Sequence, residues 1–148
     1  MYRYQILIEY LGTNFIGWQI QSKGKSVQKL IQNKLSKILK EKVSLIGSGR
    51  TDSGVHAIEQ SAHFDCKNEI PNIKKFLKSI NYFLNNMNVS IMDIKKRNLK
   101  FHARFSAKQR IYKYVIFNRL SRPSIDKKRG WHITKKLDVN LMKKGAKK

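Results

Sequence analysis

The sequence predicts an α+β fold in which helices cover one face of an antiparallel sheet. Three patterns support this prediction: apolar side chains alternate over residues 2–10, they recur at helical spacing in two later segments, and short apolar runs lie between and after those segments. In chain order the segments give β-α-β-β-α-β, which is the ferredoxin-like arrangement. The chain of 148 residues has the length of one domain, and we expect residues 1–148 to form a single domain.

The expected first strand, residues 2–10, has one face to bury. Its aromatic and aliphatic side chains occupy alternate positions, at Tyr4, Ile6, Ile8 and Tyr10. The run from Gly12 to Asn14 breaks this pattern, and the loop after it carries Phe15 and Trp18. Both rings suit core packing, although RNA-binding sites also stack bases on such rings.

Two segments have the spacing and the start signals of amphipathic helices. The first covers residues 27–41 and follows Ser26, which is a good N-cap, and the second begins near Pro71 and ends near Leu84. In both segments apolar residues recur every three or four positions, with lysines between them. Such helices bury one stripe, so we expect both to pack on the sheet.

The remaining strands are shorter. Residues 43–46 and 57–65 are expected to be strands on either side of a glycine-rich loop, and residues 110–118 alternate as a further strand. After Leu120 the chain becomes loop-like, and a last helical stretch begins at Asp138 and continues to the end of the sequence.

The strand after the second helix is predicted over residues 89–94. Strict alternation would place Val89 and Ile91 on one face and Ile94 on the other. The lysine-rich segment after it, residues 95–100, is predicted to be a basic loop.

The charge of the chain points to a polyanionic partner. Thirty-two Lys and Arg residues against nine Asp and Glu residues give a net charge of +23. Nucleic acid is the expected partner, while a composition biased toward lysine is the alternative source of part of the excess. The lysines are spread along the chain and do not form one basic amphipathic helix, which argues against adsorption to membranes.

Location is inferred from what the sequence lacks. Cys66 is the only cysteine, so neither a disulfide within the chain nor a thiolate zinc cluster can form. The N-terminus lacks the pattern of a signal peptide, and no apolar run is long enough to span a bilayer. We therefore expect a cytoplasmic protein with no membrane partner.

The segment from Gly47 to Ala57 concentrates groups that can carry chemistry. Arg50 and Asp52 lie two positions apart, so their side chains point the same way if the backbone between them is extended. An arginine near an aspartate favours the ionised carboxylate, and a partly desolvated carboxylate is a competent nucleophile or base. The alternative is a tight turn in which Arg50 and Asp52 form a local ion pair.

Residues 49–57, Gly-Arg-Thr-Asp-Ser-Gly-Val-His-Ala, resemble the GRTD-x-GVHA signature of the TruA family of tRNA pseudouridine synthases. Nine residues with one variable position make a highly specific match. The resemblance continues in order along nearly the whole chain, through Tyr10 to Gln19, Ser26 to Gln28, Gln60 to Phe64, Phe101 to Ser106 and Arg110 to Tyr114.

This resemblance implies a reaction and the residues that perform it. Asp52 would be the catalytic nucleophile, Arg50 would hold the substrate and fill the space left by a flipped base, and Tyr112 would lie against the flipped uracil. The reaction needs no metal and no cofactor. Its substrates would be uridines 38, 39 and 40 of the tRNA anticodon stem-loop. Without the resemblance, Tyr112 would be assigned to core packing with its strand neighbours.

The resemblance also implies how the chain is assembled. Family members are homodimers, and this chain would be the N-terminal half of a pseudouridine synthase fold whose second half continues from about its last residue. The final helical pattern reaches Lys148 without a C-cap, which agrees with that expectation. Residues 1–148 alone should then be far less active than a full-length relative.

Two further arginines and two other functions complete the sequence-based expectations. Arg104 and Arg110 are candidate phosphate contacts, with simple surface exposure as the alternative. A non-catalytic RNA-binding module and a metal-dependent nuclease or phosphoesterase using Asp52 and His56 are the rival functions. A metal site needs more ligands than this pair, and we expect no metal.

Overall fold

The computed structural model describes residues 1–147. Contacts within the chain divide it into two compact units, Met1–Arg110 and Ile111–Lys148. The first unit contains the glycine-rich loop and both predicted amphipathic helices. That the chain acts as one domain stays a prediction.

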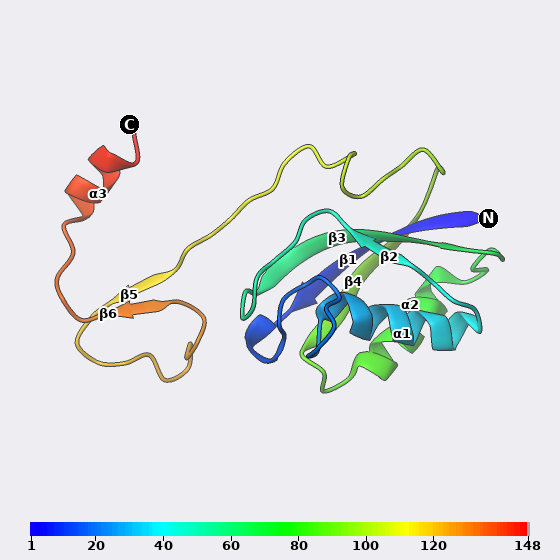
Figure 1. The fold of residues 1–148 in the computed structure, drawn as a ribbon, viewed down its shortest axis with the longest axis horizontal. Helices are drawn as coiled ribbons and strands as arrows, with labels where there is room; N and C mark the ends of the chain where they lie inside the picture. The colour runs from blue at the N-terminus through cyan, green and yellow to red at the C-terminus, as the bar shows by residue number, and fades with distance from the viewer. Residues whose placement is uncertain (148) are drawn as a thin grey trace. The chain divides into compact units, whose positions relative to one another are not determined.

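The sheet of the first unit has the strand order β2-β3-β1-β4, and each neighbouring pair is antiparallel. Its strands are β1 (Tyr2–Tyr10), β2 (Leu45–Gly47), β3 (Ala57–Cys66) and β4 (Val89–Arg97). Helices α1 (Val27–Leu39) and α2 (Ile73–Leu84) cover one face of this sheet (Figure 1). The order β1-α1-β2-β3-α2-β4 confirms the predicted α+β, ferredoxin-like arrangement.

The core lies between the sheet and the two helices. The four predicted residues of β1 are all buried, and Ser26 caps α1 by accepting a hydrogen bond from the Lys29 amide at 3.3 Å. The helices contribute one apolar stripe each, made of Val27, Ile31 and Leu35 in α1 and of Phe76, Ile80 and Leu84 in α2. The helical spacing seen in the sequence therefore identified the buried faces correctly.

Strand boundaries differ from the predictions at two places in the first unit. Strand β4 continues to Arg97, so the first part of residues 95–100 is not a loop. Arg97 pairs with Arg3 of β1, and this backbone pairing keeps the lysine-rich segment extended. Strand β2 begins at Leu45 and not at residue 43, because it pairs with β3 over three residues only.

A bulge in β4 corrects the predicted orientation of Ile94. The register of β1 against β4 shifts between Leu7 and Ile8, which gives β4 one extra residue. Ile94 consequently returns to the same side as Ile91 and is buried there. Asn81 of α2 holds this region, because its side-chain amide donates to the Ile91 carbonyl and accepts from the Ile91 amide, both at 2.8 Å.

The sheet face opposite the helices is partly covered by the chain that follows β4. Arg3 donates to both carboxylate oxygens of Asp65 at 2.7 Å, and to the carbonyls of Leu99 and Phe101 at 2.6 and 2.7 Å. The hydrogen bond from Arg3 is the main reason why the pKa of the Asp65 carboxyl lies below its ordinary value. One guanidinium thus ties residues 99–101 to the sheet.

His63 lies on the same face, under this covering segment. The residue is 1% exposed, and its Nδ1 accepts a hydrogen bond from the Ala103 amide at 3.1 Å. Burial lowers the pKa of His63 to about 4, and the nearby charges of Arg3 and His102 act in the same direction. The neutral imidazole is therefore the form that the folded protein accommodates.

The second unit is small. Strands β5 (Ile116–Asn118) and β6 (Trp131–Ile133) pair in parallel, and helix α3 (Val139–Gly145) follows them. The strand predicted over residues 110–118 forms only over its last three residues, and β6 lies in the region predicted to be loop-like. No residue from 111 to 147 is buried, so the alternating side chains have no core to face within this unit.

Helix α3 begins where the sequence predicted a helix. The Asp138 carboxylate accepts hydrogen bonds from the amides of Asn140 and Leu141 at 2.9 and 3.0 Å and so caps the first turn. The helix ends at Gly145, so the predicted continuation is wrong for residues 146 and 147, which form a turn, and Lys148 lies outside the described residues.

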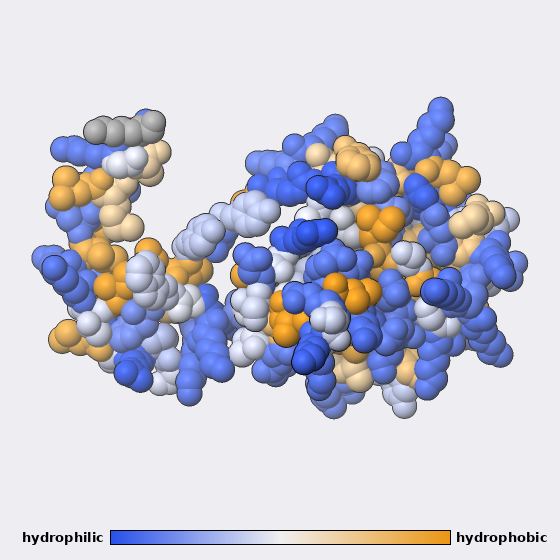
Figure 2. Space-filling view, in the orientation of Figure 1, coloured by the Kyte–Doolittle hydropathy of each residue, from blue (hydrophilic) through white to orange (hydrophobic). Residues whose placement is uncertain are grey.

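The surface of the first unit is mostly hydrophilic in the view of Figure 2, where hydrophilic residues surround small groups of apolar ones. Among residues 1–147 no helix is long and apolar enough to cross a membrane.

The buried His63 should make stability depend on pH. Its pKa is about 6.5 in the unfolded chain and about 4 in the folded one, so between these values the unfolded state binds more protons. The free energy of unfolding should therefore fall by roughly 2 to 3 kcal/mol as pH drops from about 7.5 to about 4.5. Urea unfolding of the purified chain across this range measures the effect.

A matched pair of variants assigns this pH dependence to one ring. His63→Gln keeps a side-chain acceptor for the Ala103 amide but cannot be protonated, so most of the dependence should disappear. His132→Gln, in the second unit, should leave it unchanged. An unaltered pH dependence in His63→Gln would show that other groups cause it.

Candidate active site

The loop between β2 and β3, residues 48–56, presents Asp52 to solvent. Asp52 starts a tight turn in which the Val55 amide donates to the Asp52 carbonyl at 3.2 Å. Gly54 occupies the third position of this turn with φ of +79°, a value that side-chain-bearing residues rarely adopt. The glycine of the motif therefore sets the turn from which the Asp52 carboxylate projects. We call residues 48–56 the Asp52 loop.

A second segment, residues 11–18, supports the Asp52 loop from one side, and we call it the supporting loop. It includes the short 3₁₀ turn Gly12–Asn14. Hydrogen bonds join the two loops next to Asp52: the Trp18 amide donates to the Thr51 carbonyl at 3.0 Å, and the Gly54 amide and Ser53 hydroxyl donate to the Phe15 carbonyl at 3.3 and 3.2 Å. The backbone on both sides of Asp52 is thereby fixed.

The two loops approach so closely that glycine is required in the supporting loop. A Cβ atom on Gly17 would lie 2.5 Å from the Thr51 carbonyl oxygen, and one on Gly12 would lie 1.9 Å from the Val55 carbonyl oxygen. Gly17 also has φ of +116°. These two glycines allow backbone to lie against backbone directly behind Asp52.

Aromatic side chains fill the space beneath this contact. Phe15 and Trp18 are both buried, as their predicted role in core packing requires. The Tyr10 hydroxyl lies 2.8 Å from the Thr51 hydroxyl, and the ring centroids of Tyr10 and Trp18 are 6.2 Å apart. Burial raises the pKa of Tyr10, so its phenol stays protonated and can donate to Thr51.

The start of the Asp52 loop is held from the other side by Gln60 and Arg110. Gln60 Nε2 donates to the Gly49 carbonyl at 2.6 Å, and Gln60 Oε1 accepts from the Ser48 hydroxyl at 3.2 Å. Arg110 Nε and Nη2 both donate to the Ser48 carbonyl, at 3.1 and 2.9 Å, and Nη2 also donates to the Arg104 carbonyl at 2.8 Å. The loop is thus fixed at its beginning as well as at its turn.

The side chains of Arg50 and Asp52 are both exposed. Among residues 1–147 no ion pair joins them, so the interpretation of this loop as a turn closed by a local ion pair is wrong. A structure that fixes the backbone and leaves a guanidinium and a carboxylate unpaired two positions apart is suited to meet a charged ligand.

His56 has a structural contact in the same loop. Its Nδ1 accepts a hydrogen bond from the Gly12 amide at 2.9 Å, which links the end of the Asp52 loop to the supporting loop. This nitrogen is therefore engaged with backbone. Within the described part of the chain no three His, Cys, Asp or Glu side chains are placed to hold a metal ion.

The other predicted site residues lie in different surroundings. Arg104 is exposed in the segment that covers the open face of the sheet, and its carbonyl accepts the bond from Arg110. Tyr112 belongs to the second unit, outside β5, and its side chain is 65% exposed. The core packing considered for Tyr112 is therefore not found.

Sequence reasoning missed several contacts that hold the Asp52 loop in place. Tyr10 was assigned to the core alone, and Gln60 was assigned no contact. A detectable signal existed for Gln60, because it shares the buried face of β3 with Ala62 and Phe64 and so needs polar partners there. The bonds of Arg110 had no such signal, because their acceptors are backbone carbonyls that no sequence pattern marks.

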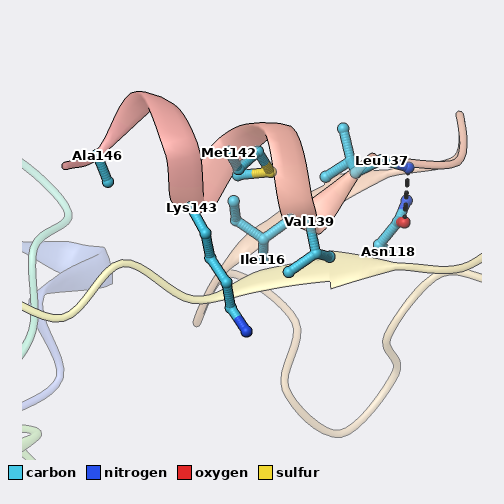
Figure 3. A pocket seen from close by; sticks show the side chains of 7 residues that line it. All are labelled: Ile116, Asn118, Leu137, Val139, Met142, Lys143 and Ala146. Atoms are coloured by element: carbon cyan, nitrogen blue, oxygen red, sulfur yellow. Dashed lines mark hydrogen bonds between the residues drawn. The ribbon is translucent and has the colours of Figure 1, made fainter. Parts of the chain in front are cut away.

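An apolar groove in the second unit is not part of this site. It has a volume of about 400 Å³ and lies between β5 and α3 (Figure 3). The Asn118 side-chain oxygen accepts from the Leu137 amide at 3.1 Å at one end, and Lys143 is the one charged side chain among the described residues that line the groove. None of the predicted catalytic or binding residues lines it.

Comparison with known proteins covers the part of the chain that contains the Asp52 loop. Residues 6–106, which include both loops, match the family of proteins described as tRNA pseudouridine synthase. The chain is 76% identical over its whole length to tRNA pseudouridine synthase A of Pelagibacter ubique (strain HTCC1062), and 43% identical over 97% of its length to the protein of the same name from Ehrlichia ruminantium (strain Gardel). It spans 60% and 58% of these two relatives. The chain therefore belongs to the tRNA pseudouridine synthase family.

Proposed function

We propose that the complete protein carrying this chain isomerises uridine to pseudouridine in tRNA, with Asp52 as the nucleophile. One observation carries this proposal: Asp52 has an exposed carboxylate, and it is the first residue of a turn whose backbone is hydrogen-bonded to the supporting loop. A carboxylate held in this way needs little reorganisation when a base is brought to it. Membership of the family supplies the class of reaction.

The reaction conserves every atom of the substrate. The N-glycosidic bond between N1 of uracil and C1′ of ribose breaks, the detached uracil rotates, and a bond forms between C5 and C1′. The proton that C5 loses is balanced by the proton that N1 gains. A carboxylate nucleophile can divide this exchange into two steps through a covalent intermediate, and it is regenerated at the end.

Arg50 and Tyr112 are proposed to handle the target nucleotide. A uridine in a stem-loop must leave the stack to reach Asp52, and the exposed Arg50 guanidinium can bind its phosphate and occupy the vacated space. The exposed ring of Tyr112 is proposed to lie against the flipped uracil. Arg104, exposed beside the site, is proposed to bind a neighbouring phosphate.

The substrate and assembly are proposed from the family resemblance. We propose uridines 38, 39 and 40 of the anticodon stem-loop as targets, a homodimer as the active species and the cytoplasm as its location. The net charge of +23 supports a tRNA partner.

Incubation with an anticodon stem-loop transcript in the presence of EDTA, followed by nucleoside analysis, tests the proposal. Pseudouridine should form, because no step depends on a metal. Binding without conversion would indicate an RNA-binding module, and cleavage that EDTA abolishes would indicate a metal-dependent nuclease.

Asp52→Asn should abolish turnover while changing RNA affinity little. The substitution keeps the shape of the side chain but removes its charge and its nucleophilicity, so kcat should fall by at least about a thousandfold. Glu59→Gln, which neutralises another exposed carboxylate beyond the same loop, is the control and should retain activity. Activity of Asp52→Asn within tenfold of the parent would rule out the assignment.

RNA affinity should depend steeply on salt. If lysine and arginine side chains neutralise phosphates, log Ka should fall linearly with log salt by roughly 0.7 to 0.9 for each phosphate neutralised. Fluorescence titration of a labelled anticodon stem-loop at several salt concentrations gives the slope. A flat response would mean that the lysine excess reflects composition and not RNA binding.

Gly17→Ala should lower turnover by displacing the Asp52 loop. The added methyl group would lie 2.5 Å from the Thr51 carbonyl oxygen, so the two loops must separate and Asp52 must move. A displacement of about 1 Å can lower turnover by about a hundredfold, which a kcat measurement will detect. Gly54→Ala is the control, because it carries backbone strain at φ of +79° but its methyl group meets no atom within 4 Å. Equal losses in both variants would show that backbone strain alone is responsible.

A further inference from the structure

Arg110 makes a set of contacts that differs from that of a phosphate-binding arginine. Its guanidinium donates three hydrogen bonds to two main-chain carbonyls, those of Ser48 and Arg104, at 2.8 to 3.1 Å. Its side chain also lies against Gly49, where a Cβ atom would meet Arg110 Nε and Cδ at 3.6 and 3.7 Å. Two of its three nitrogens are therefore committed to backbone.

These carbonyls belong to segments far apart in sequence. Ser48 starts the Asp52 loop, four residues before the carboxylate, and Arg104 lies in the segment that Arg3 and His63 fix to the open face of the sheet. A guanidinium is a planar group of fixed geometry with five donors, so it can join two such carbonyls rigidly. A lysine ammonium in its place would carry the charge without that fixed fork.

We propose that Arg110 is a positioning residue, which couples the Asp52 loop to the segment covering the sheet and so fixes Asp52 for attack. The reaction that it serves is the proposed pseudouridine synthesis, and to that extent this inference rests on the proposed function. Arg110 does not have to touch RNA in this role. Its two rivals are a phosphate contact, which its sequence position also suggested, and a purely stabilising contact.

The test compares Arg110→Lys and Arg110→Gln with Lys108→Gln in the complete protein. Lys108→Gln removes one positive charge two residues away, from an exposed side chain that makes no hydrogen bond or ion pair among residues 1–147. Arg110→Lys keeps the positive charge but removes the planar guanidinium that bonds to both carbonyls. Three quantities are measured: amide hydrogen exchange of residues 47–55, the salt dependence of RNA affinity, and kcat and KM.

The positioning role makes a distinct prediction for each measurement. Amides of the Asp52 loop should exchange about five to ten times faster in both Arg110 variants, as expected for the loss of about one net hydrogen bond, and at the parent rate in Lys108→Gln. In Arg110→Lys, kcat should fall about tenfold or more with KM nearly unchanged, because a misplaced Asp52 slows the chemical step. The salt slope should be the same in Arg110→Gln and in the parent.

Each other result would overturn the inference. Unchanged exchange in Arg110→Lys would show that the contacts do not hold the loop. A salt slope that decreases by roughly 0.7 to 0.9 in Arg110→Gln, with full kcat in Arg110→Lys, would make Arg110 a phosphate contact. Faster exchange with unchanged kcat in an active protein would leave only a stabilising role. If the parent forms no pseudouridine, the proposed function fails, whereas the exchange measurement still decides whether Arg110 holds the loop.

Discussion

The contact between the Asp52 loop and the supporting loop is the constraint on which the rest of the site depends. Two stretches of backbone touch directly, with Gly12 and Gly17 on one side and Val55 and Thr51 on the other. Hydrogen bonds between the two loops pair backbone groups that the close contact shields from water. The buried Trp18 packs under the contact. Because glycines keep Cβ atoms out of the closest approach, the carboxylate can be exposed while the chain that carries it is fixed.

The opposite face of the sheet contributes through a series of polar contacts. Arg3 donates to Asp65 and to the carbonyls of Leu99 and Phe101. Further along the same segment, the Ala103 amide donates to His63. Arg110, at the end of this segment, donates to the Ser48 carbonyl at the start of the Asp52 loop. Each member of this series bonds to main-chain atoms, whose positions are set by the fold. The helices stabilise the sheet from one side, and these contacts connect its other side to the site.

The sequence predicted the elements that bury an apolar face and the loop that carries the chemistry. Alternation in β1 and helical spacing in α1 and α2 identified the core, because burial imposes those periods. Periodicity could not locate the bulge that turns Ile94 inward, since one inserted residue changes the phase without changing the composition. Periodicity also predicted a strand over residues 110–118, around Tyr112, which forms only at its end. The apolar residues of this segment alternate, but the second unit has no core in which to bury them. The motif located Asp52, whereas the contacts that hold it come from residues distant in sequence and form no local pattern.

The hydroxyl contact between Tyr10 and Thr51 has a consequence for the order of folding. It closes a separation of 41 residues, and the bond from Arg110 to Ser48 closes one of 62. Bringing together residues so far apart in sequence costs chain entropy before the contact can stabilise the fold. Contacts of this range therefore form later than turns and helices. A growing or partly folded chain would therefore carry its helices well before Asp52 is held in place. Pairing of β1 with β4 joins Arg3 to Arg97, which are further apart in sequence still, so the Asp52 loop should become fixed only together with the sheet.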